Sequence, residues 1–441
     1  MKPEPMGEPS RLRRLALLFL FLNALSSILF IATVKYPVYD DPNNLPDVHR
    51  YASEGVSLET VRQHRNPTGP TSFFWMAAGA RILGGDELRA ARIAVLASWL
   101  ILGAAILLWG AKTSSPRLWS YALLVSLVFP HALTASATVL TEGPALLFAT
   151  LGGFLWLESV LQPSPSPRFF SLGIVGGLSM GIAATCRQYY LALLPAAVVF
   201  AYFEWRRNHA PKSSRWNWMV SLSLLAALLP VTFLLAAWKS LASPAMAAGA
   251  SYGTWKSTIG LNFTRPLIAI FYLSAYLLPI TFPAMARLSR RRRSGAVLFA
   301  AATAIAVAAA GPDFLQPGPL NSFIRFGARG PYGQFVILFA FAAVAIYNVL
   351  AVCFLLWEQR ISLSSNAPAV FALLVVVFFI AEQIGVGGNL PFYDRYILQL
   401  APFLGLIDFT ILPRLTPLRL LALACLSAFS HFMLWRLAFG G

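Results

Sequence analysis

The acidic residues of this sequence gather near its N-terminal end. The chain has 17 acidic residues against 34 basic ones, yet Asp40, Asp41 and Asp47 stand close together. A carboxylate can act as a general base that takes the proton from an acceptor hydroxyl. The Asp-Asp-Pro-Asn string that begins at Asp40 is also typical of a solvated turn with side-chain caps. The cluster therefore favours proton-transfer chemistry, with a structural turn as the alternative.

Charged residues later in the chain supply a second kind of chemistry. Glu142 begins an apolar run. Four arginines border other apolar runs: Arg187, Arg325, Arg329 and Arg395. A guanidinium group beside apolar surface can hold the phosphate of a lipid carrier through two parallel, charge-assisted hydrogen bonds. The carboxylates and arginines together predict transfer of a group from a lipid-phosphate donor to an alcohol.

The composition indicates which elements position these residues. Of the 441 residues, 58% are hydrophobic and 12% are charged, about half the charged share of a soluble domain, and the mean hydropathy is +0.66. Apolar runs of about 20 residues cross a bilayer as helices, because backbone polar groups must be satisfied within the segment. The sequence therefore predicts an all-α polytopic membrane protein with about 13 transmembrane helices. Their expected ranges are 15–35, 88–111, 117–136, 142–161, 169–185, 188–204, 217–238, 264–284, 295–311, 333–357, 367–386, 396–412 and 417–436.

The basic residues indicate how these helices are oriented. Lysines and arginines, Arg414 and Arg419 among them, lie in connectors that alternate along the chain, as the positive-inside rule expects for cytosolic loops. The N-terminus is then cytosolic and the C-terminus lies outside. The chain divides into a cytosolic tail (1–14) and one transmembrane domain (15–441), with 36–87 as its outer catalytic loop. The net charge of +17 is thus assigned to topology, so the expected partner is a lipid bilayer and not nucleic acid.

The first outer loop resembles that of the GT-C superfamily of membrane glycosyltransferases, which take sugars from polyprenyl-phosphate carriers. In that superfamily an acidic motif follows the first helix, and the loop folds as short interfacial helices. Residues 70–84 look like the second of these helices, and Gly84, Arg89 and Arg92 match the usual pattern. The resemblance covers residues 1–160 well and the rest mainly in helix order. It implies a GT-C-like fold and transfer of a hexose.

Within the superfamily the loop is most similar to the dolichyl-phosphate-glucose α-1,2-glucosyltransferase family. The counterparts of that family's motif are Pro37, Asp40, Asp41, Pro46, Arg50, Tyr51, Glu54 and Gly55. The step Arg187-Gln188 resembles the family's Arg-Gln-Thr-Asn, with two tyrosines in place of Thr-Asn, and Asn44 stands where the family has His. The resemblance implies that Tyr51 and Gln188 bind the acceptor or the sugar.

These expectations assign a role to each candidate residue. Asp40 is the expected general base in an inverting, single-displacement transfer, and Asp41 is the alternative base. One carboxylate suffices because phosphate is a good leaving group, whereas glycoside hydrolysis divides acid and base work between two carboxylates. Asp47, expected toward water, and Glu142 are expected to bind the acceptor or the sugar. The arginines expected at the donor phosphate are Arg187, Arg395, Arg325 and Arg329.

The expected partners are a polyprenyl-phosphate-linked sugar and a glycan, lipid or protein acceptor. An Ala-, Leu- and Arg-rich composition points to a bacterial inner membrane, with the site on its extracytoplasmic side. The alternatives are a flippase or transporter of lipid-linked sugars, which would bind near the bilayer midplane, and a polymerase or ligase of surface polysaccharide. The histidines lack ligand spacing, so no histidine-based metal site is expected. A divalent ion held by Asp40 or Asp41 with Glu142 stays open.

Overall fold

The computed structural model describes residues 8–113, 115–207, 213–240, 243–245, 261–262, 264–287, 290–311, 330–359, 365–385 and 394–439. Within these ranges all regular structure is helical. Nine of the helices described there are long and apolar enough to cross a bilayer, and the predicted all-α polytopic membrane fold is confirmed. The count of 13 membrane helices stays a prediction, because the other predicted spans correspond to shorter or broken elements.

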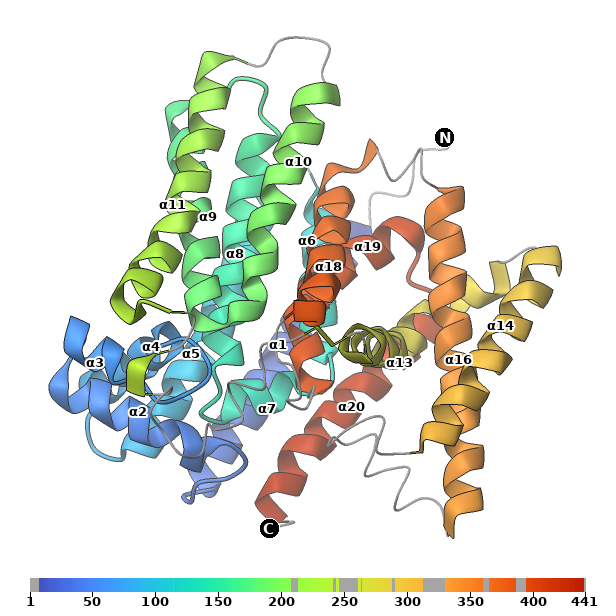
Figure 1. Ribbon diagram of the computed structural model, residues 1–441, viewed down its shortest axis with the longest axis horizontal. Coiled ribbons are helices and arrows are strands. Elements are labelled where there is room, and N and C mark those ends of the chain that lie inside the picture. The colour runs from blue at the N-terminus through green and yellow to red at the C-terminus, as the bar shows by residue number, and fades with distance from the viewer. Residues whose placement is uncertain are drawn as a thin grey trace.

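The long helices form the body of the molecule (Figure 1). They are α1 (Glu8–Thr33), α5 (Glu87–Trp109), α8 (Glu142–Val160), α9 (Pro167–Cys186), α11 (Ser214–Trp238), α13 (Thr264–Arg287), α16 (Gly330–Glu358), α18 (Ala367–Gly385) and α20 (Pro417–Phe439). The shorter elements are α2 (Asp41–Glu54), α3 (Leu58–Arg62), α4 (Thr71–Leu83), η1 (Gly110–Lys112), α6 (Pro116–Val128), α7 (Ala132–Ala137), η2 (Gln188–Ala192), α10 (Leu193–Arg207), α14 (Arg290–Ala310), η6 (Asp394–Leu400) and α19 (Ala401–Ile411). Helices α8 to α11 stand side by side, and α2, α3 and α4 lie across one end of this group.

Short helices after α1 are confirmed, and their number differs from the expectation. The predicted helix at 70–84 is α4, which is the third helix of the loop because α3 precedes it. Helix α3 has five residues and starts with a capping box between Ser57 and Thr60. A helix of this length is too short to show an apolar period in the sequence. Helix α1 begins at Glu8, within the predicted tail 1–14, and Leu12 is buried; the division of the chain into tail and transmembrane domain stays a prediction.

The predicted span 117–136 is wrong as a single helix. Helix α6 ends at Val128 and α7 begins at Ala132. Between them, Pro130 cannot donate a backbone hydrogen bond, and His131 has a φ of 69°, in the left-handed region. Broken backbone at membrane depth is tolerated where protein surrounds it, and here every residue from Leu118 to Val128 is buried. The apolar run continues through the break, so hydropathy alone does not reveal it.

Two other predicted spans also begin with a tighter turn. Span 188–204 starts as η2 and continues as α10, and span 396–412 starts as η6 and continues as α19. In both cases a 3₁₀ segment precedes the α-helix, and each 3₁₀ segment follows an arginine or contains one. These two irregular segments bring Arg187 and Arg395 to the same end of the bundle as α2.

The positive-inside pattern predicts that Arg419 is a solvated cytosolic charge, but the structure places it inside the protein. Its side chain is buried and donates hydrogen bonds to Asp408 of α19 and to the hydroxyl of Tyr121 on α6, the latter at 2.6 Å. The Tyr121 hydroxyl in turn donates to Asp408 Oδ2 at 2.6 Å. The charge of Arg419 is therefore compensated inside the protein, where it ties three helices together.

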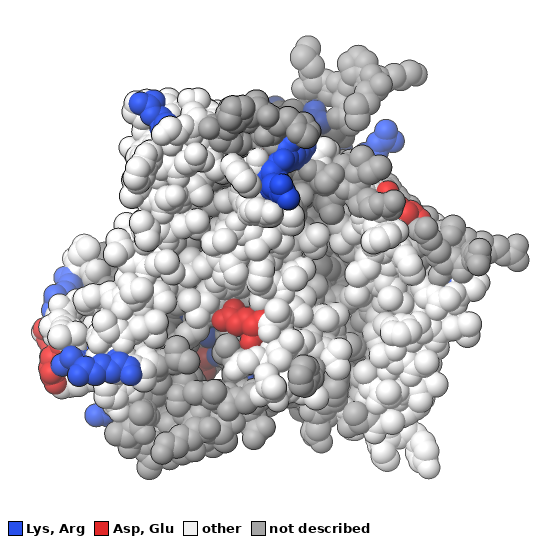
Figure 2. All heavy atoms as spheres, turned by 45° about the horizontal axis from the view of Figure 1, so that its top comes forward, with Lys and Arg blue, Asp and Glu red and all other residues white. Residues whose placement is uncertain are grey.

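The first and last helices meet at one end of the molecule. The hydroxyl of Tyr36, just after α1, donates a hydrogen bond of 2.6 Å to the carbonyl oxygen of Ala438 at the end of α20. Helix α1 has 26 residues, about 39 Å of length at 1.5 Å per residue, so its start lies at the opposite end. Figure 2 shows that charged side chains are sparse on the drawn face and lie mostly near its edges.

Candidate active site

Asp40 stands where the chain leaves α1 and turns into α2. It is the N-cap residue of α2, and its carbonyl oxygen accepts hydrogen bonds from the backbone N–H groups of Asn43 and Asn44. Pro42 favours the helix start because its fixed φ suits the first turn. The Asp40 side chain is 29% exposed and lies 2.6 Å from Arg395, Oδ2 to Nη2. The candidate base therefore lies at the N-terminus of α2, with an arginine beside it.

Two buried arginines and a buried glutamate adjoin Asp40. Arg187 follows α9 as its C-cap, Arg395 belongs to η6, and Glu142 is the first residue of α8. Glu142 Oε1 forms an ion pair with Arg187 and lies 3.3 Å from Arg395 Nε. We call Asp40, Glu142, Arg187 and Arg395 the Asp40 cluster. It joins four segments that are far apart in the sequence.

Aromatic rings support both guanidinium groups of the cluster. The Arg187 guanidinium carbon lies 5.3 Å from the ring centre of Tyr396, and that of Arg395 lies 5.0 Å from the ring centre of Tyr39. Burial alone would lower the pKa of Arg395, but Glu142, Tyr39 and Asp40 raise it well above the ordinary value. The guanidinium of Arg395 therefore stays charged at every physiological pH.

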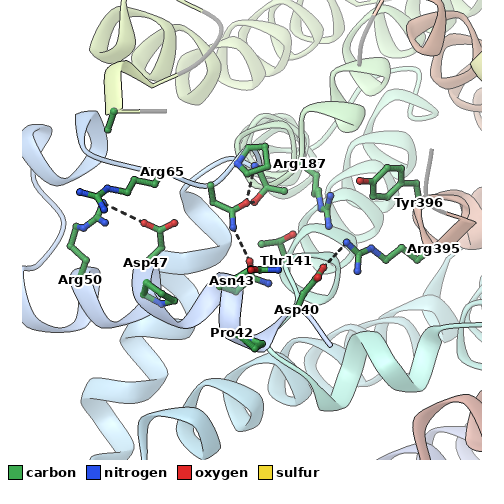
Figure 3. Close-up of a pocket in the computed structure, with 16 residues that line it drawn as sticks. Asp40, Pro42, Asn43, Asp47, Arg50, Arg65, Thr141, Arg187, Arg395 and Tyr396 are labelled. Carbon is green, nitrogen blue, oxygen red and sulfur yellow. Dashed lines mark hydrogen bonds and ion pairs between the residues drawn. The ribbon is translucent and has the colours of Figure 1, made fainter. Parts of the chain in front are cut away.

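A cavity of about 930 Å³ opens beside the cluster. Figure 3 shows its two ends: Asp40, Arg187, Arg395 and Tyr396 at one, and Asp47, Arg50 and Arg65 at the other. The first end has two cations and a carboxylate suited to a phosphate and a reacting hydroxyl. The second end has a carboxylate and two guanidinium groups, which suit the hydroxyls of a sugar or another polar acceptor.

The sequence predicts that Asp47 faces water, and this prediction is wrong. It is buried, lines the cavity and lies 3.3 Å from Arg50 Nη1 and 3.8 Å from His64 Nδ1. The reason is that α2 packs along α4, so the second turn of α2, which carries Asp47, faces inward. Burial lowers the pKa of His64, with Asp47 opposing the effect. His64 is therefore neutral near pH 7, and its Nε2–H donates to the carbonyl oxygen of Thr68 at 2.7 Å.

Asp41 is placed apart from the cavity although it directly follows Asp40. Its side chain is fully buried, and Oδ2 lies 2.5 Å from Arg92 Nη2. The backbone N–H groups of Val38 and Val139 donate to its two carboxylate oxygens at 3.0 and 2.6 Å. Asp41 therefore ties the start of α2 to α5 and to the segment before α8. These contacts give it a structural place, and Arg92 is its counterion.

The remaining candidates lie beside the cavity walls or outside the described chain. Tyr51 is buried and donates its hydroxyl hydrogen bond to Thr60 O at 3.2 Å. Gln188 donates to Pro67 O at 2.9 Å. Neither side chain lines the cavity; Gln188 holds the loop that does, and Tyr51 holds α3. Arg325 and Arg329 lie outside the described residues.

Three polar residues at or near this end of the bundle carry no role predicted from the sequence. Arg65 and Thr141 line the cavity without having been assigned a role. Arg265, at the start of α13, is fully buried and donates to Gln383 Oε1 at 3.3 Å. Their spacing in the sequence follows no motif, so only a helix-start position hinted at Arg265.

The sequence leaves open a divalent ion held by Asp40 or Asp41 with Glu142. In the part of the chain that the structure describes, no three His, Cys, Asp or Glu side chains approach closely enough to hold an ion. Asp40 and Glu142 both face Arg395, and Asp41 faces Arg92. In this arrangement arginines provide the positive charge beside all three carboxylates.

The loop that borders the cavity is pressed against the end of α9. The backbone N–H of Gly69 donates to Cys186 O at 3.2 Å, and a Cβ at Gly69 would lie 1.8 Å from the carbonyl oxygen of Thr185. We expect Gly69→Ala to displace this loop, lowering the apparent Tm and the turnover. Overpacking of this kind costs about 1–3 kcal/mol. Thermal unfolding of the purified protein measures the effect.

Gly295→Ala on α14 is the matched control, because nothing lies within 4 Å of the added Cβ. It should leave turnover at the wild-type value and should not lower the apparent Tm, since alanine favours a helix interior over glycine. A Gly69→Ala protein as stable and active as the wild type would show that the loop is not held this tightly.

No family model and no curated protein sequence matches this chain. Among solved structures, ArnT from Cupriavidus metallidurans bound to undecaprenyl phosphate is 15% identical, with a TM-score of 0.41 over 94% of this chain and 77% of ArnT. The apo form of the same protein gives 14% identity, a TM-score of 0.41, and coverage of 95% and 77%. The Archaeoglobus fulgidus oligosaccharyltransferase in its apo form is 13% identical, with a TM-score of 0.36 over 85% of this chain and 56% of its own. Likenesses this distant assign the chain neither a family nor an activity.

Proposed function

We propose that this chain is a GT-C-type glycosyltransferase that moves a hexose from a polyprenyl-phosphate carrier to a hydroxyl of a glycan, lipid or protein. The observation that carries the proposal is the Asp40 cluster: one accessible carboxylate and two buried guanidinium groups at one end of a large cavity. Ionisable groups at the end of an apolar helix bundle are costly and are therefore usually functional. The short helices α2 to α4, which follow α1 directly, support the same type of enzyme.

The donor phosphate would bind between Arg187 and Arg395. Both guanidinium groups line the cavity, and such groups recognise phosphate oxygens through a planar, two-pronged geometry. The isoprenoid tail would lie along the apolar surfaces of the long helices, which extend away from this end. A lipid tail and a charged head would thus each meet matching surface.

Asp40 would take the proton of the acceptor hydroxyl as its oxygen attacks the anomeric carbon. The bond from that carbon to the phosphate oxygen breaks in the same step, and the electron pair stays on the phosphate, which the arginines stabilise. Attack from the face opposite the leaving group inverts the anomeric centre. The acceptor would be held at the other end of the cavity, where Asp47 and Arg50 lie.

The proposed location is a bacterial inner membrane with the cavity on the extracytoplasmic side. This orientation follows from the basic connectors, and it places α2 to α4 outside together with the end of α20. A reporter fused after Gly441 should then behave as extracytoplasmic. A cytosolic signal from this reporter would contradict the odd number of crossings.

The decisive experiment is a donor assay with the purified protein in lipid nanodiscs. Polyprenyl phosphates that carry different hexoses are supplied together with a lipid and glycan extract of the host membrane. We expect release of polyprenyl phosphate and labelling of one acceptor fraction with one of the sugars, and neither with Asp40→Asn. If no sugar is transferred but the protein moves the lipid across vesicle membranes, the transporter alternative replaces this proposal.

Arg187→Lys and Arg395→Lys should each raise the donor KM by about tenfold, or ~1.4 kcal/mol. Lysine keeps the charge but loses the two-pronged hydrogen bonding to phosphate. Initial rates at varied donor concentration measure the effect, with thermal unfolding as the check on folding. Arg89→Lys is the matched control, because Arg89 is exposed at the start of α5 and does not line the cavity. Unchanged donor KM in both variants would place the phosphate elsewhere.

A further inference from the structure

The Asp40 cluster is electrically balanced without a donor. Its two carboxylates and two guanidinium groups carry formal charges that sum to zero. Arg395 lies 2.6 Å from Asp40 and 3.3 Å from Glu142, and Arg187 pairs with Glu142. A phosphate brings a further negative charge into this buried group. It competes with the two carboxylates for the charge of Arg395, because uncompensated buried charge is costly.

The two carboxylates differ in their freedom to move. Glu142 is almost fully buried at the first turn of α8, with both arginines on the same oxygen. The Asp40 side chain is 29% exposed, stands at the N-cap of α2 and faces the cavity. Rotation of the Asp40 side chain moves it into the cavity without breaking a helix. Asp40 is therefore the carboxylate that an incoming phosphate displaces.

We propose that Arg395 acts as a switch that holds Asp40 until the donor phosphate takes its place. This inference rests on the proposed function and adds an order of events to it. While Arg395 holds Asp40, protonation of the carboxylate would cancel the charge that the buried guanidinium pairs with, which opposes transfer of a proton from an acceptor hydroxyl. When the phosphate takes over the guanidinium, Asp40 is released into the cavity close to the bound sugar. Arg395 is then a positioning residue for the base as well as a ligand of the phosphate.

The switch explains how the site avoids activating hydroxyls when no donor is bound. Water or acceptor that enters the cavity meets a carboxylate whose charge is already paired with Arg395. Glu142 stays in place throughout and keeps Arg187 and Arg395 aligned. The exchange costs donor affinity, since a competing contact lowers apparent affinity by the fraction of time that the arginine is occupied.

This cost gives a test by binding alone. Asp40→Asn removes the competing charge and keeps the shape, so the variant should bind undecaprenyl phosphate about tenfold more tightly than the wild type, as expected if Asp40 holds Arg395 roughly nine-tenths of the time. Binding is measured in nanodiscs by titration with undecaprenyl phosphate. Asp86→Asn is the control, because Asp86 is an exposed cap of α5 outside the cavity, and asparagine can also cap. It should bind like the wild type.

A double-mutant cycle assigns the effect to Arg395. In an Arg395→Gln background the Asp40→Asn change should no longer tighten binding, because the contact is already lost. If the wild type binds undecaprenyl phosphate and transfers sugar, but Asp40→Asn binds no more tightly, the switch is wrong and the proposed function stands. If neither the wild type nor Asp40→Asn binds undecaprenyl phosphate, the donor class itself is wrong, and the proposed function and the switch both fail.

Discussion

Asp40→Asn is expected to lower turnover by about 10²- to 10⁴-fold, the usual loss when a general base is removed. Asparagine has nearly the same shape, so the N-cap of α2 is kept, while the group can no longer take a proton. Arg395 loses one carboxylate partner but keeps Glu142 at 3.3 Å, and the 29% exposure of the Asp40 side chain at the cavity limits the cost. The apparent Tm should therefore stay near the wild-type value. Initial rates at saturating donor and a thermal unfolding curve provide both measurements.

The same substitution at the exposed cap residue Asp86 is the control for charge removal, and it should leave turnover unchanged. Wild-type turnover in Asp40→Asn would remove Asp40 from the mechanism. The proposed switch at Arg395 would then have no base to release.

Asp41→Asn is expected to act on the fold. Asp41 is fully buried, lies 2.5 Å from Arg92 and accepts two backbone hydrogen bonds. The amide leaves the Arg92 guanidinium without its counterion, and removing one partner of a buried pair costs about 3–5 kcal/mol. We expect a clearly lower apparent Tm and a lower yield of folded protein. Turnover per folded molecule should stay within a factor of a few.

A second substitution separates this effect from catalysis. Arg92→Gln in the Asp41→Asn background removes the orphaned charge and should restore part of the lost Tm, because the cost lies in the unpaired ion. An Asp41→Asn protein that is as stable as the wild type but inactive would instead make Asp41 the base. The neighbouring aspartates are thus told apart by which property each substitution changes.

The helices were predictable because apolar runs of membrane length leave the backbone no alternative to helix. The break at Pro130 was not, since the run stays apolar while the backbone of His131 turns into the left-handed region. The positive-inside rule counts charges and carries no information about their partners. It therefore predicts that Arg419 lies in water. In the structure that arginine is enclosed by Asp408 and Tyr121.

Within the candidate site, the sequence identified the chemistry of single residues better than their arrangement. Asp40, Arg187 and Arg395 were named from residue type and from their position at the ends of apolar runs, and the fold brings them together. Nothing in the string Asp40-Asp41 shows that one carboxylate faces the cavity and the other a buried arginine. That division arises because Asp40 caps α2 while Asp41 is its first residue and turns toward α5.

The Asp40–Arg395 contact also has a consequence for biosynthesis. The aspartate leaves the ribosome early, whereas fourteen of the described α-helices, from α2 to α18, separate it from its arginine in η6. The hydrogen bond from Tyr36 to Ala438 likewise waits for the last helix to enter the membrane. A nascent chain that still lacks these helices has an incomplete site and cannot be active. Two co-expressed halves divided in a cytosolic connector could therefore each be inert alone and regain turnover on assembly.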